Sequence, residues 1–149
     1  MRKYPYYPAW DGKHEQPITT KVIELCHKRY KTKCLGSYVV RPMRGKPDLS
    51  VHATGYACDL GADIKTLEEM WKFFVINSAA LRVAECHFYK ASGTKFGLGY
   101  RCSRGEGLAG VKHWTATDNG GSGGLWLHLE LEEQDPEHFE AEFRRLKPS

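Results

Sequence analysis

A strictly alternating segment near the carboxyl end constrains the fold of this chain most strongly. Leucine occupies every second position of residues 125–131, and Trp126, His128 and Glu130 lie between the leucines. Successive side chains of a β-strand point to opposite faces of a sheet, so this segment predicts a strand with one apolar and one polar face. We expect all four leucines, including Leu125, to pack on the core. The other three side chains would then point away from it.

Helical periodicity marks three other segments. Apolar residues recur at helical spacing in residues 20–30 and again after Asp63, whose carboxylate can cap a helix that runs through about Ser78. A closing helix begins at Asp135 and Pro136, which are a favourable cap and first helical residue. Each of these segments has an apolar face that must be buried against another element.

The remaining segments predict short strands and loops. Residues 37–41 and 81–89 are rich in β-forming side chains, and residues 93–124 form a long glycine-rich excursion with few periodic signals. Residues 1–17 carry four aromatic side chains among prolines and predict an extended strap. Together these patterns predict an α+β fold, in which a small antiparallel sheet carries the site and packs against flanking helices. We expect one domain over residues 1–149.

The net charge of the chain limits the kinds of molecule that its surface can bind. The formal net charge is +4, and the basic residues are spread along the sequence without a block of five or six. Such a surface attracts polyanions weakly, including bacterial wall polymers. No predicted helix has a basic face and no nucleic-acid motif is present, so we do not expect nucleic acid as a partner.

Two further patterns concern the membrane and the thiols. The chain has no run of about 18 apolar residues, and residues 1–10 lack the apolar stretch of a secretory signal, so we expect synthesis in the cytoplasm and no membrane insertion. The five cysteines include no Cys-x-x-Cys pair, which indicates reduced thiols and argues against a thiolate zinc cluster.

The densest chemical signal lies between Ser50 and Asp59. His52 and Asp59 are seven positions apart and are separated mainly by small residues. An imidazole nitrogen and a carboxylate oxygen each bind zinc at about 2.0–2.2 Å, and three protein ligands leave a fourth position open. His128, on the polar face of the alternating strand, supplies the third ligand. Small residues at Gly55 and Ala57 would let His52 and Asp59 converge on one ion.

This pattern resembles a family of zinc peptidases that includes D-alanyl-D-alanine carboxypeptidases and dipeptidases and phage L-alanyl-D-glutamate endopeptidases. Hedgehog signalling domains share the fold of this family. The resemblance covers about residues 37–131 and implies one Zn²⁺ ion and cleavage of peptidoglycan peptides. The family pattern, Ser-x-His-x-x-Gly-x-Ala-x-Asp and a distant strand with a final His, is matched by Ser50, His52, Gly55, Ala57, Asp59 and His128.

The resemblance also implies a substrate-binding arginine. Family members carry an Arg after a strand, often followed by Pro, and Arg41 precedes Pro42 in this way. In the family this guanidinium contacts the substrate and stabilises the oxyanion, which is an effective role in a site that excludes water. Arg44 is the alternative.

The general base departs from the family pattern. Family members usually have Glu or Asp three positions before the last His, where this chain has Leu125. Glu130 lies two positions after His128 on the same strand face, where it would either accept a proton from a metal-bound water or orient a metal ligand. We take Glu130 as the candidate general base. Other candidates are Asp118, Glu106 and His113.

These observations favour a zinc metallopeptidase that cleaves peptidoglycan stem peptides, similar to a phage endolysin and acting on the cell wall after release. We expect a monomer that is targeted by its charge or by a separate wall-binding partner chain. The alternative is a catalytically inactive, zinc-stabilised binding module, which the hedgehog resemblance and Leu125 both permit. The sequence leaves open which stem bond is cut.

Overall fold

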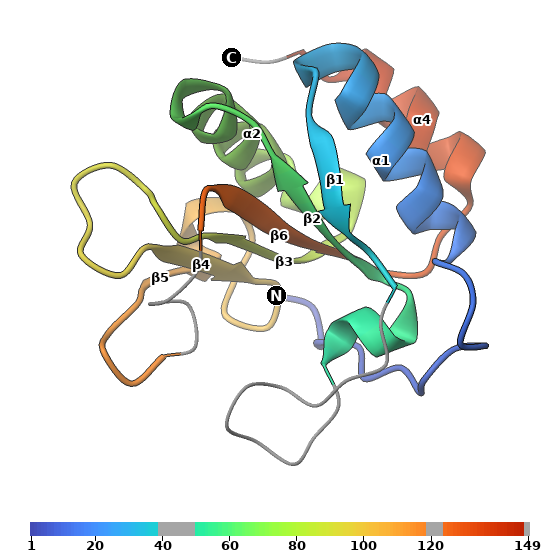
Figure 1. Ribbon diagram of the computed structural model, residues 1–149, viewed down its shortest axis with the longest axis horizontal. Helices are drawn as coiled ribbons and strands as arrows, with labels where there is room; N and C mark the ends of the chain where they lie inside the picture. Colours follow the sequence, from blue (N-terminus) through green and yellow to red (C-terminus); the bar gives the residue numbers. More distant parts are fainter. Residues whose placement is uncertain (39–49, 119–123, 148–149) are drawn as a thin grey trace.

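The computed structural model describes residues 1–38, 50–118 and 124–147 of the protein (Figure 1). The strands are β1 (Lys33–Gly36), β2 (Ala57–Gly61), β3 (Val83–Phe88), β4 (Leu98–Arg101), β5 (Val111–His113) and β6 (Trp126–Leu131). The helices are α1 (Pro17–Tyr30), α2 (Ile64–Ile76), α3 (Ser78–Leu81) and α4 (Pro136–Arg145), and the 3-10 turns are η1 (Val51–Thr54) and η2 (Gly107–Gly110).

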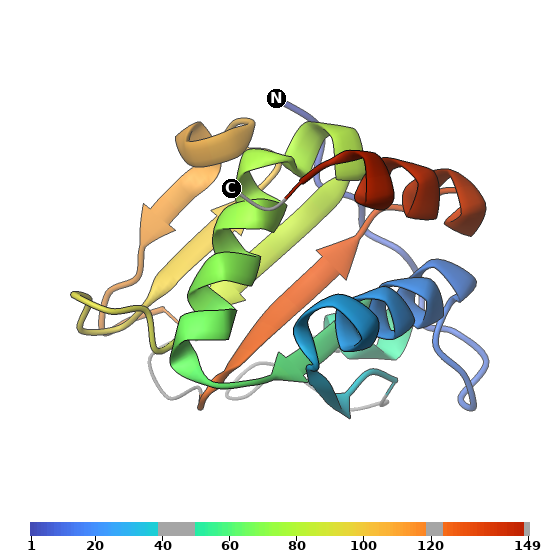
Figure 2. The same ribbon diagram turned by 90° about the horizontal axis from the view of Figure 1, so that it is seen from above.

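The strands form one antiparallel sheet in the order β1-β2-β6-β3-β4-β5. Helices α1, α2 and α4 lie on one side of this sheet, above it in Figure 1 and in front of it in Figure 2. The N-terminal segment and η1 lie on the other side. The α+β fold class, with a small antiparallel sheet packed against helices, is therefore confirmed.

The alternation in β6 orients this central strand. Leu127, Leu129 and Leu131 are almost completely buried in the core beneath the helices, whereas Leu125 precedes the strand and keeps 44% of its surface exposed. The prediction that Leu125 belongs to the buried apolar face is therefore wrong. The alternation of side chains applies only once the chain has joined the sheet, and β6 begins at Trp126.

Two of the predicted helix starts are confirmed by their hydrogen bonds. The Asp63 carboxylate accepts a hydrogen bond of 2.8 Å from the Thr66 backbone N–H at the start of α2. The Asp135 carboxylate accepts one of 3.0 Å from the Glu137 N–H at the start of α4. Helix α1 begins three residues before the predicted segment because Pro17, whose φ suits a helix, occupies its first turn.

One strand prediction and one loop prediction need correction. The edge strand is Lys33–Gly36, and Ser37 and Tyr38, the described part of the predicted strand, lie outside it. The pairing of β1 with β2 is irregular between Cys34 and Gly36, and the strand ends after Gly36, which is still paired with Asp59. The glycine-rich excursion also contains regular structure, namely β4, η2 and β5, which are only three or four residues long and too short to show a periodic pattern.

The N-terminal segment is held against the sheet and η1 by backbone hydrogen bonds. The Arg2 N–H donates to the Cys102 carbonyl at 3.1 Å, and the Trp10 N–H donates to the Ala53 carbonyl at 2.8 Å. Side chains of this segment differ in exposure, because Tyr4 is buried and Tyr6 is 80% exposed. The predicted strap is thus an integral layer over the sheet face that the helices leave uncovered (Figure 1).

Candidate metal centre

Polar side chains of three adjacent strands share the sheet face opposite the helices. Asp59 on β2 pairs with His128 on β6, and His128 pairs in turn with His87 on β3. Two residues along the strands, Glu130 pairs with Glu85. Directly paired residues of antiparallel strands carry their side chains on the same face. The five side chains therefore form two neighbouring rows across the sheet.

The turn η1 brings His52 to the end of the first row. Ser50 caps this turn, since its Oγ accepts a hydrogen bond of 3.3 Å from the His52 N–H. Gly55 ends the turn at φ 79°, and a Cβ atom there would lie only 3.0 Å from the Gln16 backbone nitrogen. Glycine is needed at this position for its left-handed backbone and for the close approach of Gln16. This requirement differs from the expectation that a small residue at Gly55 lets His52 and Asp59 converge.

His52 presents a single ring nitrogen to Asp59. Its Nδ1 lies 2.8 Å from the Ser37 carbonyl oxygen, which can only accept a hydrogen bond, so Nδ1 carries the proton. Its Nε2 lies 3.4 Å from Asp59 Oδ2. A histidine that donates one ring N–H to a backbone carbonyl is oriented to bind a metal through the other nitrogen.

His128 is oriented in the same way by a carboxylate. Its Nε2 lies 2.5 Å from Glu130 Oε2, and its Nδ1 lies 3.1 Å from Asp59 Oδ1. When Nε2 donates its proton to Glu130, the lone pair of Nδ1 faces Asp59. The two imidazole rings of His52 and His128 lie edge to face, with centroids 5.1 Å apart.

The three predicted ligands lie close enough together to hold one metal ion. One ligand atom from each of His52, Asp59 and His128 lies within 4.8 Å of the other two. Two atoms bound to a tetrahedral zinc at about 2.1 Å lie roughly 3.4 Å apart. The two nitrogen-to-carboxylate distances, 3.4 Å to Oδ2 and 3.1 Å to Oδ1 of Asp59, are close to this value, although each runs to a different oxygen. The donor set of two imidazoles and a carboxylate suits zinc and leaves room for a fourth ligand.

Asp59 is held as a carboxylate in spite of its burial. Burial alone would raise its pKa, but protonated His128 and His52 rings outweigh this effect through hydrogen bonds and charge and lower the pKa below its usual range. In the neutral tautomers given above, a bound cation would take the place of these protons. The ligand is therefore ionised at neutral pH, as metal binding requires.

Glu130 joins the metal centre to the N-terminal segment. The Tyr4 hydroxyl donates a hydrogen bond to Glu130 Oε1, while Oε2 faces His128. The Arg101 guanidinium lies 4.2 Å from the centroid of the Tyr4 ring. Burial, and next the charge of Glu85, raise the pKa of Glu130 to about 7. The contact of Tyr4 could not be predicted from the sequence, because no local pattern brings residue 4 to residue 130.

Glu85 and His87 form a second polar pair beside His128. The two side chains are 3.1 Å apart, and Glu85 also forms an ion pair with Arg101. The His87 ring stacks on the His128 ring, with centroids 5.2 Å apart and planes 28° from parallel. These two residues were not among the predicted site residues, although their alternation with buried Cys86 and Phe88 is a usable signal of a polar strand face.

The other predicted site residues lie elsewhere or outside the described residues. Arg41 and Arg44 lie in the range 39–49, which is outside them. Glu106 is paired with Arg2 at 2.7 Å, and His113 is exposed at the end of β5. Asp118 accepts a hydrogen bond from the Thr115 N–H and contacts the Lys112 ammonium. Neither metal-binding group found among the described residues includes Glu106, His113 or Asp118.

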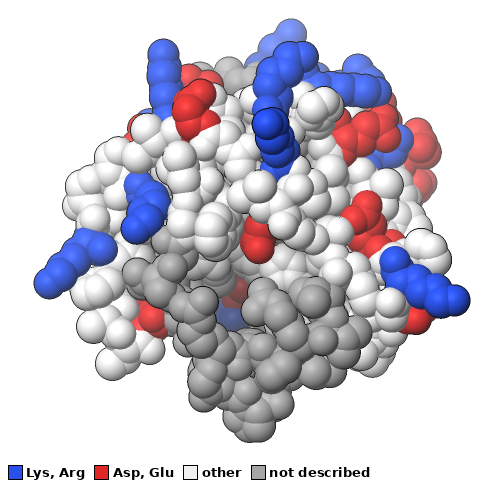
Figure 3. All heavy atoms as spheres, viewed as in Figure 1, with Lys and Arg blue, Asp and Glu red and all other residues white. Residues whose placement is uncertain are grey.

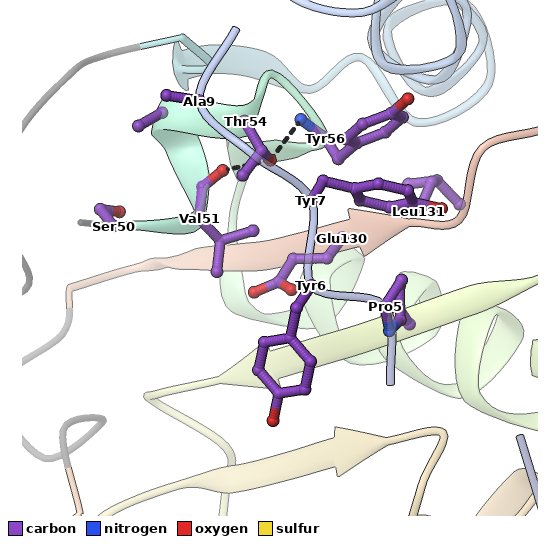
Figure 4. Close-up of a pocket in the computed structure, with 12 residues that line it drawn as sticks. Pro5, Tyr6, Tyr7, Ala9, Ser50, Val51, Thr54, Tyr56, Glu130 and Leu131 are labelled. Atoms are coloured by element: carbon purple, nitrogen blue, oxygen red, sulfur yellow. Dashed lines mark hydrogen bonds between the residues drawn. The ribbon is translucent and has the colours of Figure 1, made fainter. Parts of the chain in front are cut away.

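Two cavities flank the rows of polar side chains. One, of about 160 Å³, lies between the N-terminal segment and η1, and is lined by Tyr6, Tyr7, Ser50, Val51 and Glu130 among others. Figure 4 shows the Glu130 carboxylate between Tyr6 and Val51, with the N-terminal segment passing over β6. The other cavity, of about 220 Å³, lies on the far side of His128 and is lined by charged residues of β3, β4 and β5.

The visible surface carries dispersed charge. Basic side chains are scattered over the face seen in Figure 3, with acidic side chains among them. Within the described parts of the chain, no helix is both long and apolar enough to cross a membrane. Comparison of the chain with protein-family models, with curated proteins and with solved structures finds no match.

Proposed function

We propose that this protein is a zinc-dependent hydrolase that cleaves peptide bonds in peptidoglycan stems. The observation that carries the proposal is the convergence of one ligand atom each from His52, Asp59 and His128 to within 4.8 Å of one another. The spacing of these residues in the sequence, together with Ser50, Gly55 and Ala57, supports the peptidase class through the family resemblance.

The described residues would have separate roles in binding the metal and orienting its ligands. His52, Asp59 and His128 would hold Zn²⁺, which when bound polarises a carbonyl and lowers the pKa of a bound water. The Ser37 carbonyl and Glu130 fix the protonated nitrogen of each histidine. The carbonyl and the carboxylate thereby keep the ligand nitrogens free of protons.

Glu130 remains the candidate general base. Its carboxylate lines the cavity beside η1, which would admit a substrate, and its pKa near 7 suits proton transfer at neutral pH. Its contact with His128 Nε2, on the opposite side of the ring from Asp59, also suits a positioning role. Arg41 remains the candidate for binding the substrate and stabilising the oxyanion.

Metal analysis tests the ligand set directly. We expect one zinc per chain, and near-complete loss of bound zinc in His52→Ala, Asp59→Ala and His128→Ala. Cys58→Ser is the matched control, because Cys58 adjoins Asp59 in β2 but is buried on the opposite face of the strand. Full zinc content in any of the three ligand variants would show that the centre is misassigned.

Digestion of purified peptidoglycan tests the reaction. We expect new free amino groups, together with peptide fragments that mass spectrometry can assign to one stem bond. A chelator should abolish the activity and added zinc should restore it. Release of reducing sugars without peptide cleavage would indicate a glycosidase and would refute the proposed reaction.

A second candidate function is a zinc-stabilised binding module without turnover. Two observations favour it: Leu125 replaces the usual acidic residue, and Glu130 is already engaged by Tyr4 and His128. Such a module would bind zinc through the same ligands and would bind peptidoglycan, but it would leave the stem peptides intact. An endolysin-like role on the wall, with targeting by charge or by a partner chain, belongs to the first proposal.

A further inference from the structure

His128 lies between two groups of side chains that can bind a metal. One group is the proposed centre, with His52 and Asp59, and the other consists of Glu85, His87 and His128 itself. In each group, one ligand atom per residue lies within 4.8 Å of the other two. Asp59 on β2 and His87 on β3 pair with His128 from opposite sides of β6. The proposed function uses only the first group.

The His128 imidazole can bind an ion for only one group at a time. Its Nδ1 lies 3.1 Å from Asp59 Oδ1, and its Nε2 lies 2.5 Å from Glu130 Oε2. A neutral imidazole has a lone pair on one nitrogen and a proton on the other. When Nδ1 binds the ion of the proposed centre, Nε2 donates to Glu130. When Nε2 binds an ion instead, Nδ1 keeps the proton and donates to Asp59, so both nitrogens are satisfied in either arrangement.

Glu85 and His87 supply two further ligand atoms from β3. Glu85 pairs with Arg101 through Oε1, while its Oε2 lies 3.1 Å from His87 Nε2. An ion between Oε2 and Nε2 would replace the proton that these atoms share, and Arg101 would still hold the carboxylate through the other oxygen. Two atoms bound to one tetrahedral zinc lie roughly 3.4 Å apart, so this pair is already close to the required spacing.

The two imidazole rings also have a suitable separation. The centroids of the His87 and His128 rings are 5.2 Å apart, and two imidazoles bound to one tetrahedral zinc have centroids roughly 5 Å apart. The ring planes are 28° from parallel, so one ring must turn before both lone pairs point at the same ion. His87 lines the cavity of about 220 Å³ and has room to turn there.

Two buried carboxylates favour a cation at this place. Glu85 and Glu130 pair directly across β3 and β6 and are only 3% and 2% exposed. Like charges in a buried setting repel each other unless a proton or a cation lies close to both. Arg101 offsets one of the two charges, and a divalent ion beside His128 Nε2 would offset the remainder. Glu130 Oε2, which already faces Nε2, is in position to become a fourth ligand.

The larger cavity gives an ion access to the second group. Glu85 and His87 both line it, and so do Arg101, Arg104 and Lys112. The positive charges of these three side chains oppose the approach of a cation. We therefore expect the second group to bind an ion more weakly than the proposed centre does.

We propose that Glu85, His87 and Nε2 of His128 form a second zinc-binding site, whose occupation excludes an ion from the proposed metal centre. The exclusion rests on the metal centre of the proposed function. Binding of an ion by Glu85 and His87 depends neither on that centre nor on peptidase activity.

Titration of His52→Ala with Zn²⁺ alone tests the second site. This substitution removes a ligand of the proposed centre and none of the second group. When zinc is in large excess, we expect the metal-free variant to bind one ion with an affinity roughly 10²- to 10⁴-fold weaker than that of the parent. Equilibrium dialysis measures both affinities. The absence of saturable binding by His52→Ala would refute the second site.

Double variants assign the weak binding to particular residues. His52→Ala/His87→Gln should bind zinc at least roughly 10-fold more weakly than His52→Ala, whereas His87→Gln alone should keep the one tightly bound zinc of the parent. His52→Ala/His113→Gln is the matched control, because His113 is exposed on β5 and belongs to neither group. Circular dichroism verifies that each variant is folded. Equal zinc affinities of the two double variants would contradict the assignment.

Nitrogen-15 NMR of the histidine rings tests the exclusion, because the chemical shifts distinguish a metal-bound nitrogen from a protonated one. We expect zinc on Nδ1 of His128 in the parent and on Nε2 in His52→Ala. Zinc on Nδ1 in both proteins would overturn the proposal. If His87→Gln loses the tightly bound zinc and His52→Ala keeps it, the second site stands and the proposed centre is wrong. Failure of the protein to cleave peptidoglycan would alter none of these results.

Discussion

Glu130 is the most deeply engaged side chain beside the three proposed metal ligands. It is 2% exposed and contacts Tyr4 on one side and His128 on the other. A buried carboxylate with both oxygens engaged holds its neighbours in one arrangement. Substitution of this residue therefore acts on the histidine ligand as well as on any proton transfer.

Glu130→Gln distinguishes proton transfer from positioning. We expect the turnover of zinc-loaded protein to fall by at least ~10-fold. Loss of a general base would lower the rate by ~10²–10⁴-fold while zinc affinity is kept, whereas loss of a positioning group would lower metal affinity or activity by ~10–100-fold. Zinc affinity from chelator competition and single-turnover rates at saturating zinc give the two quantities separately. If the zinc affinity and the single-turnover rate of Glu130→Gln both equal those of the parent, Glu130 is excluded from the site. Asp118→Asn would then be the next variant.

Tyr4→Phe removes only the hydroxyl group that donates a hydrogen bond to Glu130. We expect the free energy of unfolding to fall by about 1–3 kcal/mol, because a buried carboxylate oxygen loses its donor while the ring remains packed. Denaturant unfolding measures this change, and zinc affinity should weaken in parallel. Tyr6→Phe is the control, since Tyr6 is 80% exposed and its change should stay within about 0.5 kcal/mol. Equal effects of the two substitutions would contradict the role of the Tyr4 hydroxyl.

At the scale of elements, β6 links the core to the site. Its leucines hold the strand beneath the helices, and the side chains between them form the rows on the opposite face. A shift of one residue in its pairing would exchange the two faces. Core packing on one side of β6 therefore fixes the position of His128 on the other.

Leu129→Ala and Leu125→Ala test this division of β6. Leu129 is fully buried, so we expect its truncation to lower the free energy of unfolding by about 2–5 kcal/mol. Leu125 is 44% exposed and lies before the strand, so its truncation should change that free energy by less than about 1 kcal/mol. Thermal or denaturant unfolding measures both. A large loss for Leu125→Ala would restore the original prediction that it packs on the core.

The sequence predicted long, strongly patterned elements well and short ones poorly. Helices capped by Asp63 and Asp135 and the alternating strand β6 were found because their local patterns are unambiguous. Strands β4 and β5 are stabilised by pairing with other segments of the chain, and no local sequence pattern predicts them. The structure brings His52, Asp59 and His128 close together, and metal binding by them stays a prediction, whereas the contact of Tyr4 depends on tertiary structure alone.

At the scale of the whole molecule, the N-terminal segment works as part of the fold. Arg2 contacts Glu106 at 2.7 Å and Glu132 at 2.9 Å, and donates to the Val83 carbonyl at 2.8 Å. Together with Tyr4, this places one end of the chain against β3, η2 and the residue that follows β6. The sheet face that carries the polar rows is thus covered by a segment distant in sequence from all of them.

Removal of residues 1–10 should therefore destabilise the protein. We expect a loss of roughly 3–6 kcal/mol from the buried Tyr4 ring and the hydrogen bonds of Arg2. Chemical unfolding of the truncated protein measures the loss, and failure of the truncated chain to fold would agree with it. An unchanged unfolding midpoint would show that the segment only rests on the surface.

The direct pairing of Asp59 with His128 determines when the proposed metal centre can form during synthesis of the chain. The two residues are separated by 69 positions in sequence, so their juxtaposition waits until β6 has left the ribosome and inserted between β2 and β3. A nascent chain that ends before β6 has two of the three donors and no closed centre. Metal binding would then follow the insertion of β6, and only a chain whose sheet is complete would bind the ion through all three side chains.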